Sequence, residues 1–540
     1  MTPFELADRV WEELLEDQPL LGTMVGDERY DDRLPDLGEA GRARRADRAR
    51  AALADLAALD GSALDLQERT ALDVVRAIAE RELAELEHRL DRLRVVSHLW
   101  GPGQLLVELG TYQRADTPER LERLLARLSA TPAYYAAAVE VSRDGLASGV
   151  VAPRIVVERT LAQVERLLAA PLEDSPALLA VPTEDAEGRE RVVRALREIV
   201  HPALEGYRAA LRDYLPHATE TIGLAALPGG EAMYAAEILA HTTLPLTPRE
   251  VHELGMDELE RIQEERRACS QRLGYEDPAR AAAEAASRAA SPEELVALAE
   301  AQVAKGWEAA PAWFGRLPSE PCEVRSVEPF READMPFAFY QPPSQDGSRR
   351  GVYYLNAYGL AHKPLHHLAT TTYHEANPGH HLQIALEQEL GDRPAIRRFA
   401  GYLTGTAFCE GWGLYAERLA DEMGLFEDEL ERLGMLEMQG MRAARLVVDT
   451  GIHAFGWPRE RAVALLEEAG VPRVDAEIEV DRYVTMPGQA LAYKIGQHEI
   501  ERLRAEAARR EGPAFSLRDF HDRLLALGTL PLPAIRRELG

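Results

Sequence analysis

Residues 371–383 read "TTYHEANPGHHLQ" and begin as a zinc-binding helix does. Such a helix carries His-Glu-x-x-His, in which two histidines one turn apart hold the metal and the glutamate acts as a base. Here the residue four positions after His374 is Pro378, which cannot bind a metal, and the next histidines are His380 and His381. The segment therefore predicts a metal site only if its helix is interrupted.

The geometry of a regular helix shows why an interruption is needed. Each residue turns by about 100°, so His374 and His381 would share a face about 10 Å apart, too far for one ion. Pro378 disfavours a continuous helix. Two local structures are open: a bulge or break across residues 376–379, or a new helix that begins at Pro378 with Asn377 as its N-cap. Either would bring two histidines to one ion.

Further candidate ligands surround this segment. Six of the fifteen histidines fall within twenty residues: His362, His366, His367, His374, His380 and His381. Imidazole is the commonest neutral metal ligand in proteins, and Glu375 stands where zinc enzymes place the base that activates water. Downstream, "CEGWGLYAERL" offers Glu410 and Glu417, seven residues apart on a predicted helix. A catalytic zinc needs a third protein ligand, and these glutamates are the candidates.

The composition of the chain limits the classes of protein to which it can belong. The chain has 540 residues, 46% of them hydrophobic and 28% charged, and no apolar run approaches the roughly 20 residues that span a bilayer. No secretory signal is visible, so we expect a cytoplasmic protein. The net charge of -29 argues against nucleic acid or an anionic membrane as a partner. Three widely spaced cysteines fit neither a disulfide framework nor a cysteine-based zinc site.

Three sections follow one another along the chain. Residues 1–210 predict an N-terminal scaffold of amphipathic helices, and residues 211–320 predict a middle helical section. Residues 321–540 hold the metal-site motifs, C-terminal helices and a small sheet, of which "RRGVYYLNAY" (349–358) is the best strand candidate. We expect a mainly α protein whose sections pack as one body.

Several long motifs together resemble a known family. They are "HEANPGHHLQ", "CEGWGLYAE", "RLVVDTGIHAFGW" and "DRYVTMPGQALAYKIG", with "DERYDDRLPD" and "HTTLPLTPREVHELG" earlier in the chain. In this order they resemble the family catalogued as domain of unknown function 885, and the resemblance covers nearly the whole chain. That family is in turn similar to helical gluzincin peptidases such as thimet oligopeptidase and carboxypeptidase Taq.

This resemblance implies a fold and a ligand set. The fold would be a large helical body with a deep channel and a small β-sheet beside the zinc-binding helix. The ligands would be His374, His380 and Glu410, with Glu375 as the base. A two-residue insertion separates this segment from the gluzincin pattern, so His381 stays an alternative to His380. Glu417 is predicted to lie in the shell around the ligands.

The resemblance also implies a donor for the oxyanion that forms during amide hydrolysis. A late-helix tyrosine lies near zinc in helical gluzincins, which favours Tyr493 in "PGQALAYKIG". His453 and Tyr483 are the alternatives.

Residues for substrate binding complete the predicted site. Lys494 or Arg482 is predicted to hold a substrate carboxylate. Tyr483 is predicted to bind substrate as well. On the strand candidate, Tyr354 and Asn356 are predicted to line the substrate site, where the strand edge could pair with an extended peptide.

The sequence thus predicts a zinc-dependent hydrolase acting on peptides or small amides, with one zinc ion per chain and manganese or cobalt as other possible ions. Water would be activated by the metal and Glu375. Two alternatives stay open: a non-catalytic peptide-binding or structural protein whose insertion has ruined the metal site, and an amidase of specialised metabolism. Substrate preference, exopeptidase or endopeptidase action and oligomeric state are not determined by the sequence.

Overall fold

The computed structural model describes the chain except for residues 62–63, 286, 328–335, 344–349, 361–362 and 392. It divides into two compact units. Unit 1 comprises residues 1–237, 452–459 and 478–487, and unit 2 comprises residues 238–451, 460–477 and 488–540. The predicted boundary at residue 210 falls inside a helix of unit 1. The predicted middle section, 211–320, is divided between the two units.

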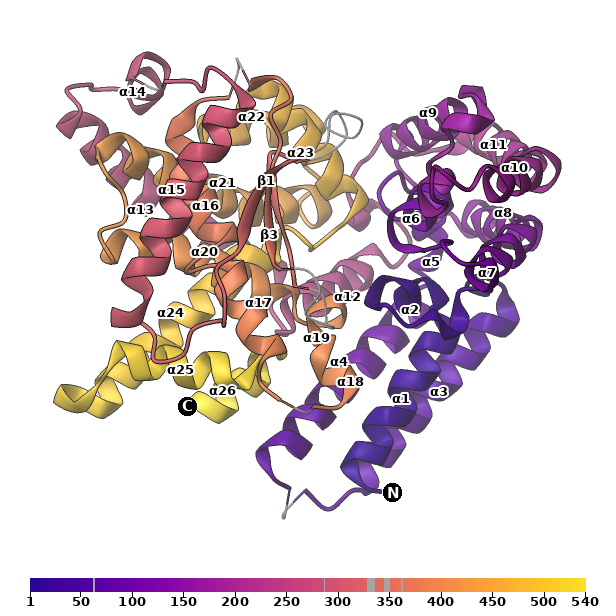
Figure 1. The fold of residues 1–540 in the computed structure, drawn as a ribbon, viewed down its shortest axis with the longest axis horizontal. Coiled ribbons are helices and arrows are strands. Elements are labelled where there is room, and N and C mark those ends of the chain that lie inside the picture. Colours follow the sequence, from indigo (N-terminus) through magenta and orange to yellow (C-terminus); the bar gives the residue numbers. More distant parts are fainter. Residues whose placement is uncertain (62–63, 286, 328–335, 344–349, 361–362, 392) are drawn as a thin grey trace. The chain divides into compact units, whose positions relative to one another are not determined.

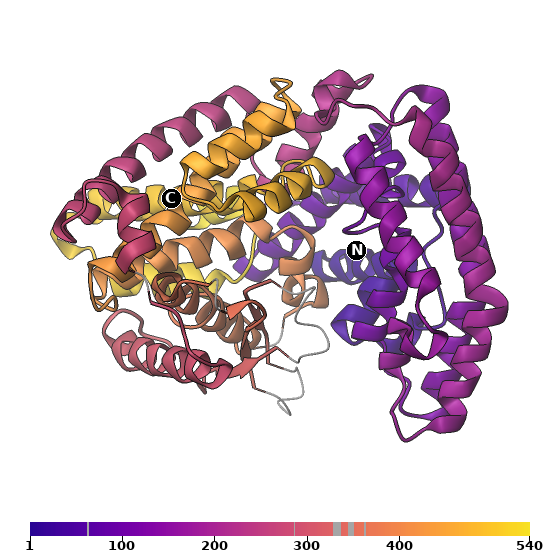
Figure 2. The same ribbon diagram turned by 90° about the horizontal axis from the view of Figure 1, so that it is seen from above.

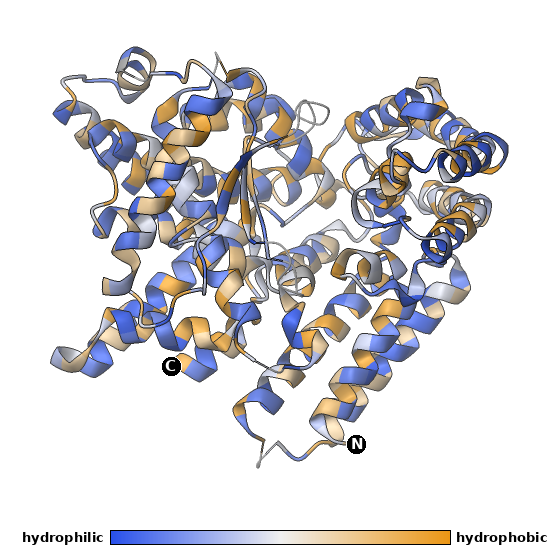
Figure 3. Cartoon of the chain, in the orientation of Figure 1, coloured by the Kyte–Doolittle hydropathy of each residue, from blue (hydrophilic) through white to orange (hydrophobic). Residues whose placement is uncertain are grey.

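Unit 1 is helical. Its elements are α1 (Pro3–Asp17), α2 (Pro19–Val25), α3 (Glu39–Ala58), α4 (Leu66–Glu87), α5 (Asp91–Arg94), α6 (Leu105–Tyr112), α7 (Pro118–Ser129), α8 (Thr131–Ser148), α9 (Arg154–Ala169), α10 (Ala186–Ala195), α11 (His201–Tyr214) and the start of α12 (Gly230–Thr242). Side chains such as Leu124, Val157 and Leu204 are fully buried in its core. Hydrophilic and hydrophobic residues alternate along most helices, as amphipathic packing requires (Figure 3).

Unit 2 contains the remaining helices and the sheet. The helices are α13 (Pro248–Arg272), α14 (Pro278–Ala285), α15 (Pro292–Ala309), α16 (Leu368–Glu375), α17 (His380–Gln388), α18 (Ala395–Arg398), α19 (Ala400–Leu403), α20 (Thr406–Glu422), α21 (Glu429–His453), α22 (Arg459–Glu468), α23 (Arg473–Thr485), α24 (Leu491–Glu511), α25 (Leu517–Leu527) and α26 (Leu532–Leu539). Short segments of α21, α22 and α23 belong to unit 1. The α13 helix begins at Pro248 behind a Thr247–Glu250 capping box.

The sheet of unit 2 has three strands, β1 (Glu323–Ser326), β2 (Ala338–Gln341) and β3 (Val352–Leu355), in the order β1-β3-β2. The β3 strand confirms the strand candidate, but it pairs with β1 in parallel and with β2 antiparallel. Both of its edges are therefore occupied. The idea that this strand offers a free edge to a peptide is wrong, because its backbone groups already pair on both sides.

The sheet lies beside α15 and α16 (Figures 1 and 2). Val324 of β1 and Tyr353 and Leu355 of β3 pack with Leu368 and Val303 in one buried cluster. The predicted mainly α fold with a small sheet beside the motif helix is thereby confirmed, whereas the deep channel stays a prediction. In the described part of the chain, no helix is long and apolar enough to cross a bilayer.

Two helices that meet closely position one side of the site. Gly411 of α20 faces Gly496 of α24, and a Cβ atom on Gly411 would lie 2.4 Å from the carbonyl carbon of Gly496. Only glycines permit this approach of the two backbones. It brings α20, the helix of Glu410 and Glu417, firmly against α24.

Candidate metal centre

The motif helix is interrupted where the sequence requires it. The α16 helix ends at Glu375 and α17 begins at His380, so four residues lie between them, joined by a cis peptide bond at Asn377–Pro378. The break predicted across residues 376–379 is therefore present. A new helix starting at Pro378 is not, because the N-cap of α17 is Gly379.

Two contacts hold this break. The indole Nε1 of Trp412 donates hydrogen bonds to the carbonyl oxygens of Pro378 at 3.0 Å and Gly379 at 3.2 Å. These bonds fasten the break to α20, and the Gly379 carbonyl oxygen also accepts from the backbone N–H of Gln383 at 3.1 Å in the first turn of α17. Gly379 itself packs on the end of α16, since a Cβ atom there would lie 1.9 Å from the carbonyl oxygen of His374.

The break brings three ligand-type atoms together. The Nε2 atoms of His374 and His380 lie 3.7 and 3.6 Å from Oε2 of Glu410. Their rings are perpendicular, with centroids 4.7 Å apart. All three donor atoms lie within 4.8 Å of one another. We call His374, His380 and Glu410 the metal cluster.

His381 is held elsewhere. Its Nε2 donates to the carbonyl oxygen of Glu320 at 2.9 Å, and its Nδ1 lies 2.9 Å from the hydroxyl of Tyr340, which donates to it. Burial lowers the pKa of His381 to about 4. Both ring nitrogens are thus engaged, and the geometry favours His380 over the alternative His381.

A glycine makes room for both imidazoles. A Cβ atom on Gly413 would lie 2.8 Å from Cε1 and Nε2 of His374 and 3.0 Å from Cε1 of His380. Any side chain on this turn of α20 would push the rings away. Gly413 therefore belongs to the site, although it carries no reactive group.

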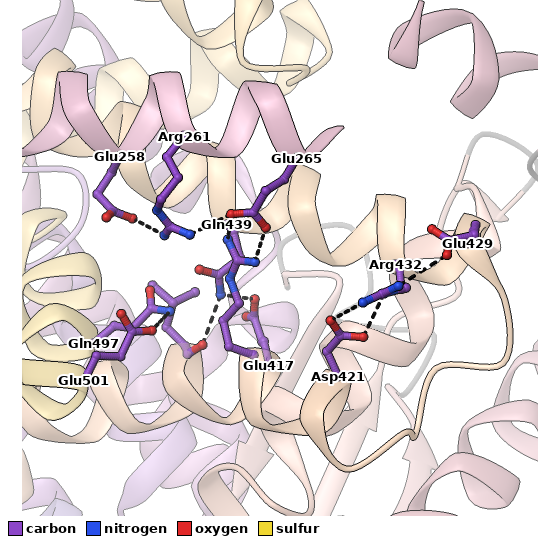
Figure 4. Close-up of polar contacts among 12 residues, drawn as sticks. Glu258, Arg261, Glu265, Glu417, Asp421, Glu429, Arg432, Gln439, Gln497 and Glu501 are labelled. Carbon is purple, nitrogen blue, oxygen red and sulfur yellow. Dashed lines mark hydrogen bonds and ion pairs between the residues drawn. The ribbon is translucent and has the colours of Figure 1, made fainter. Parts of the chain in front are cut away.

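A buried chain of polar contacts continues from His374. Its Nδ1 donates to Oε1 of Glu417 at 2.8 Å, which leaves Nε2 free to bind a metal. Gln439 donates to Oε2 of Glu417 at 2.9 Å and accepts from Lys494 at 3.1 Å. Lys494 forms an ion pair with Glu258 at 3.0 Å. In Figure 4, Gln439 of α21 and Glu417 of α20 point toward each other, and Glu258 contacts Arg261 on α13.

The carboxylates dominate the electrostatics of the cluster. Burial opposes protonation of His374, but the nearby carboxylate of Glu410 and the hydrogen-bonded carboxylate of Glu417 raise its pKa to about 10. Burial likewise opposes ionisation of Glu410, yet the two imidazoles hold its pKa well below the usual range. The pKa of Glu417 is also lowered despite burial, chiefly by the positive charge of Arg442 and by His374. The site therefore attracts positive charge.

Glu375, the predicted base, is half-buried at the end of α16. Within the described part of the chain its carboxylate forms no hydrogen bond or ion pair. Burial raises the pKa of the Cys322 thiol to about 12, and the charge of Glu375 contributes to this rise. It contributes in the same direction at Tyr353 of β3. The charge of Glu375 also acts on His374 of the metal cluster, whose pKa it helps to raise.

Tyr493 and Lys494 stand side by side on α24. The guanidinium of Arg445 stacks over the ring of Tyr493, 4.6 Å from its centroid. Lys494 is only 1% exposed and paired with Glu258. The geometry thus contradicts Lys494 as the group that holds a substrate carboxylate, because its charge is already matched inside the core.

Tyr354 and Asn356 have packing roles. The ring of Tyr354 stacks on Phe339 with centroids 5.0 Å apart. Asn356 is 2% exposed, and its Oδ1 accepts from the backbone of Tyr358 at 2.9 Å. These contacts give no support to a direct role in substrate binding.

His453, Tyr483 and Arg482 belong to unit 1, whereas the metal cluster belongs to unit 2. His453 is fully buried, donates from Nε2 to the carbonyl oxygen of Tyr483 at 3.0 Å, and accepts from the backbone of Leu224 at 3.4 Å. Burial lowers its pKa to about 4. Tyr483 is also fully buried, and Arg482 pairs with Glu479. These contacts favour structural roles in unit 1 for all three residues.

A second group of two histidines and one glutamate lies just before α16. The Nε2 atoms of His366 and His367 each lie 2.8 Å from the same Oε2 of Glu437. Arg266 approaches the other oxygen of Glu437 at 3.4 Å and donates to the carbonyl oxygen of Ala469 at 3.0 Å. We call His366, His367 and Glu437 the hydrogen-bonded cluster. His362, the remaining histidine of the segment, lies outside the described residues.

Sequence reasoning missed four residues around the metal cluster: Trp412, Gly413, Gln439 and Arg442. Trp412 and Gly413 lie within the "CEGWGLYAE" motif, so the motif itself was the available signal. Gln439 and Arg442 lie on α21, 29 and 32 positions after Glu410 in sequence, and no spacing rule connects them to it.

A family model covers almost the whole chain. The family described as "Bacterial protein of unknown function (DUF885)" matches residues 19–539. The chain belongs to this family. No curated protein matches it.

Two solved structures resemble this family member over their full lengths. A protein of Colwellia psychrerythraea, described as a putative lipoprotein, is 26% identical, covers 99% of this chain and 98% of its own, and has a TM-score of 0.91. A protein of Shewanella oneidensis, described as a putative lipoprotein of unknown function, is 19% identical with a TM-score of 0.81 and 99% coverage of both chains. The second likeness concerns the fold alone.

Proposed function

We propose that this DUF885 protein is a zinc-dependent hydrolase of peptide or amide bonds. The observation that carries the proposal is the convergence of His374, His380 and Glu410, with Glu375 next to a ligand in sequence and Glu417 behind it. A tetrahedral zinc ion places its ligand atoms about 3.4 Å apart. The separations of 3.6 and 3.7 Å agree with this value.

Charge supports the same proposal. With neutral imidazoles, Glu410, Glu417 and Glu375 bring three negative charges, and Arg442 brings one positive charge that acts on Glu417. Two negative charges remain, which a divalent cation would balance. The His374–Glu417 pair also matches the carboxylate–histidine arrangement that orients metal ligands and makes them more basic.

The residues of this chain would divide the work of hydrolysis. When bound, zinc lowers the pKa of water and polarises a carbonyl oxygen. Glu375 would accept the proton of the attacking water and deliver it to the leaving amine. Glu417 would keep the proton of His374 on Nδ1, so that Nε2 stays a ligand. Tyr493 stays our predicted donor to the oxyanion.

Metal analysis and a cleavage assay test the proposal. Purified protein loaded with zinc, manganese or cobalt is incubated with a peptide library and with N-acyl amides, beside the Glu375→Gln variant. Cleavage by the wild type and not by the variant supports hydrolysis. A bound ion without any cleavage would favour the binding protein, and cleavage of small amides alone would favour the amidase.

We further propose a cytoplasmic location. The two solved structures are described as putative lipoproteins, so fractionation of the native host with an antibody against the chain decides between the two locations.

A further inference from the structure

Lys494 of α24 is a buried ammonium whose donors are all used. Its Nζ donates to Oε1 of Gln439 at 3.1 Å and to Oε1 of Gln497 at 2.9 Å, and it lies 3.0 Å from Oε2 of Glu258. An ammonium has three N–H donors and no acceptor. Each donor of Lys494 therefore has one partner, and any group that contacts this nitrogen must present an acceptor to it.

This requirement fixes which way the side-chain amide of Gln439 faces. Gln439 is fully buried on α21, and its Oε1 accepts from Lys494. Its Nε2 therefore faces the other way and donates to Oε2 of Glu417 at 2.9 Å and to the carbonyl oxygen of Leu414 at 3.0 Å. The reversed amide would set an oxygen against the Glu417 carboxylate and an NH₂ group against the ammonium. Both contacts would be repulsive, and buried polar groups without a partner are costly.

Glu417 connects this amide to a metal ligand. The carboxylate is 1% exposed, and its Oε1 accepts from Nδ1 of His374 at 2.8 Å while its Oε2 accepts from Gln439. The carboxylate cannot rotate without losing one of the two bonds. Hydrogen bonds thus run in one direction, from donor to acceptor, from Lys494 to the carboxylate that keeps the proton of His374 on Nδ1.

We propose that Lys494 is a positioning residue of the metal cluster. Through the Gln439 amide it fixes the Glu417 carboxylate, which in turn keeps Nε2 of His374 free for the ion. Partners that orient a metal ligand change metal affinity without touching the ion. This inference rests on the metal site of the proposed function, and it gives Lys494 a role that its ion pair with Glu258 does not require.

The rival role is that Lys494 only holds α24 against α13 through Glu258. Two control variants separate the roles. Gln497→Met removes another buried amide from the same ammonium, but this amide leads away from the metal cluster, since its Nε2 donates to Glu501 at 2.9 Å. Glu258→Gln removes the ion pair and keeps the contact between Lys494 and Gln439.

Zinc affinity is measured by competition with a chelator of known affinity. Lys494→Met and Gln439→Met should each weaken zinc binding about tenfold, as loss of an orienting partner does. Gln497→Met and Glu258→Gln should stay within about twofold of the wild type, the usual scatter for independent sites. An unchanged affinity in Lys494→Met would overturn the inference, as would an equal loss in Glu258→Gln.

A double variant tests whether the two residues act by one path. Lys494→Met combined with Gln439→Met should lose about as much zinc affinity as Gln439→Met alone, because the lysine acts only through the amide. Losses that multiply would overturn the inference. Lys494→Gln keeps N–H donors but can also turn its carbonyl oxygen toward Gln439, so its affinity should fall between those of the wild type and Lys494→Met.

The visible spectrum of the cobalt-loaded protein is a readout that a loss of stability alone would not change, because it reports the geometry of the ligands. Lys494→Met and Gln439→Met should shift the absorption bands in the same way, and Gln497→Met should keep the wild-type spectrum. Thermal unfolding of each variant checks the fold, and Lys494→Gln replaces Lys494→Met if the latter does not fold. A wild-type spectrum in the lysine variant would contradict a positioning role.

These measurements separate failure of this inference from failure of the proposed function. A wild type that binds no zinc would overturn both. Zinc bound equally well by the wild type and by Lys494→Met would overturn the inference and leave the hydrolase proposal standing. Zinc binding that weakens as predicted, without cleavage of any substrate, would support the inference and count against hydrolysis.

Discussion

The metal cluster and the hydrogen-bonded cluster contain the same residue types and lie at opposite ends of one short helix, yet they differ in spacing and charge. In the metal cluster the Nε2 atoms of His374 and His380 lie 3.7 and 3.6 Å from Glu410. The three carboxylates at this site, those of Glu375, Glu410 and Glu417, outnumber the one guanidinium, that of Arg442, which acts on Glu417. In the hydrogen-bonded cluster both imidazoles contact one oxygen of Glu437 at 2.8 Å, and Arg266 contacts the other oxygen.

A set of converging ligand residues makes a metal site only if its spacing and its net charge also suit an ion. Glu437 and Arg266 balance each other, so a cation at the hydrogen-bonded cluster would add uncompensated charge. The distance of 2.8 Å is that of a hydrogen bond and is short for two ligands of one ion. We therefore expect metal at the first cluster and a structural role for the second.

The largest expected effect concerns the base. Glu375→Gln should lower kcat/KM by about 10²–10⁴-fold, the usual contribution of general acid–base catalysis, while zinc content stays unchanged. Steady-state assays on the best library substrate measure this effect. An unchanged rate would contradict the assignment of Glu375, and a loss of zinc would make it a ligand instead of a base.

The next effect sharpens the structural role of the hydrogen-bonded cluster. Glu437→Gln leaves Arg266, which is 5% exposed, without its carboxylate and should cost about 3 kcal/mol of unfolding free energy at neutral pH. Denaturant unfolding of the wild type and the variant measures this difference. A variant as stable as the wild type would contradict the role.

The pH dependence of that difference has a definite sign. Burial alone would raise the pKa of Glu437, but His366 and His367 hold it far below its ordinary value of 4.5. A carboxyl whose pKa is lowered on folding stabilises the protein above that ordinary value. The gap between wild type and Glu437→Gln should therefore be full above pH 4.5 and shrink as the pH falls below it.

A smaller effect tests the support of the metal cluster. Glu417→Gln removes the charge behind His374 and should weaken zinc binding by about 10–100-fold, as such outer-shell changes do. Competition with a chelator of known affinity measures it. The matched variant at the other cluster, Glu437→Gln, should leave zinc affinity unchanged. An equal loss of zinc affinity in both variants would contradict different roles for the two clusters.

The smallest effect concerns the glycine beneath the imidazoles. Gly413→Ala would place a methyl 2.8 Å from the His374 ring, and we expect about a tenfold loss of zinc affinity from this displacement. Gly206→Ala in α11 is the control, because nothing lies within 4 Å of its added methyl. It should raise stability by about 0.4–1 kcal/mol. Unchanged zinc affinity in Gly413→Ala would show that the rings can shift.

Features that depend on residues close together in the sequence could be predicted from the sequence. Helical periodicity and the Pro378–Gly379 signal indicated a mainly α fold and an interruption of the motif helix. The ligand set needed the family resemblance, because nothing local brings Glu410 to His374. The choice between His380 and His381 needed the structure, since it depends on Glu320 and Tyr340, which come from other parts of the chain.

The contacts of other predicted site residues also depend on parts of the chain that are distant in sequence. Lys494, His453 and Arg482 are the reactive types that a site uses, but each is matched by a partner distant in sequence or packed in a core. The strand at β3 was recognised from its β-branched and aromatic residues, whereas its central place in the sheet depends on β1 and β2. Arg442 lacked any local signal, because the carboxylate on which its charge acts, that of Glu417, lies 25 positions earlier in the sequence.

The metal content of variants of the two clusters decides which of them holds the ion. Wild type, His380→Ala and His367→Ala are purified without tags that bind metal, saturated with zinc, dialysed and measured by elemental analysis. We predict one zinc per chain in the wild type and in His367→Ala and almost none in His380→Ala. Zinc retained by His380→Ala, or lost from His367→Ala alone, would contradict this prediction.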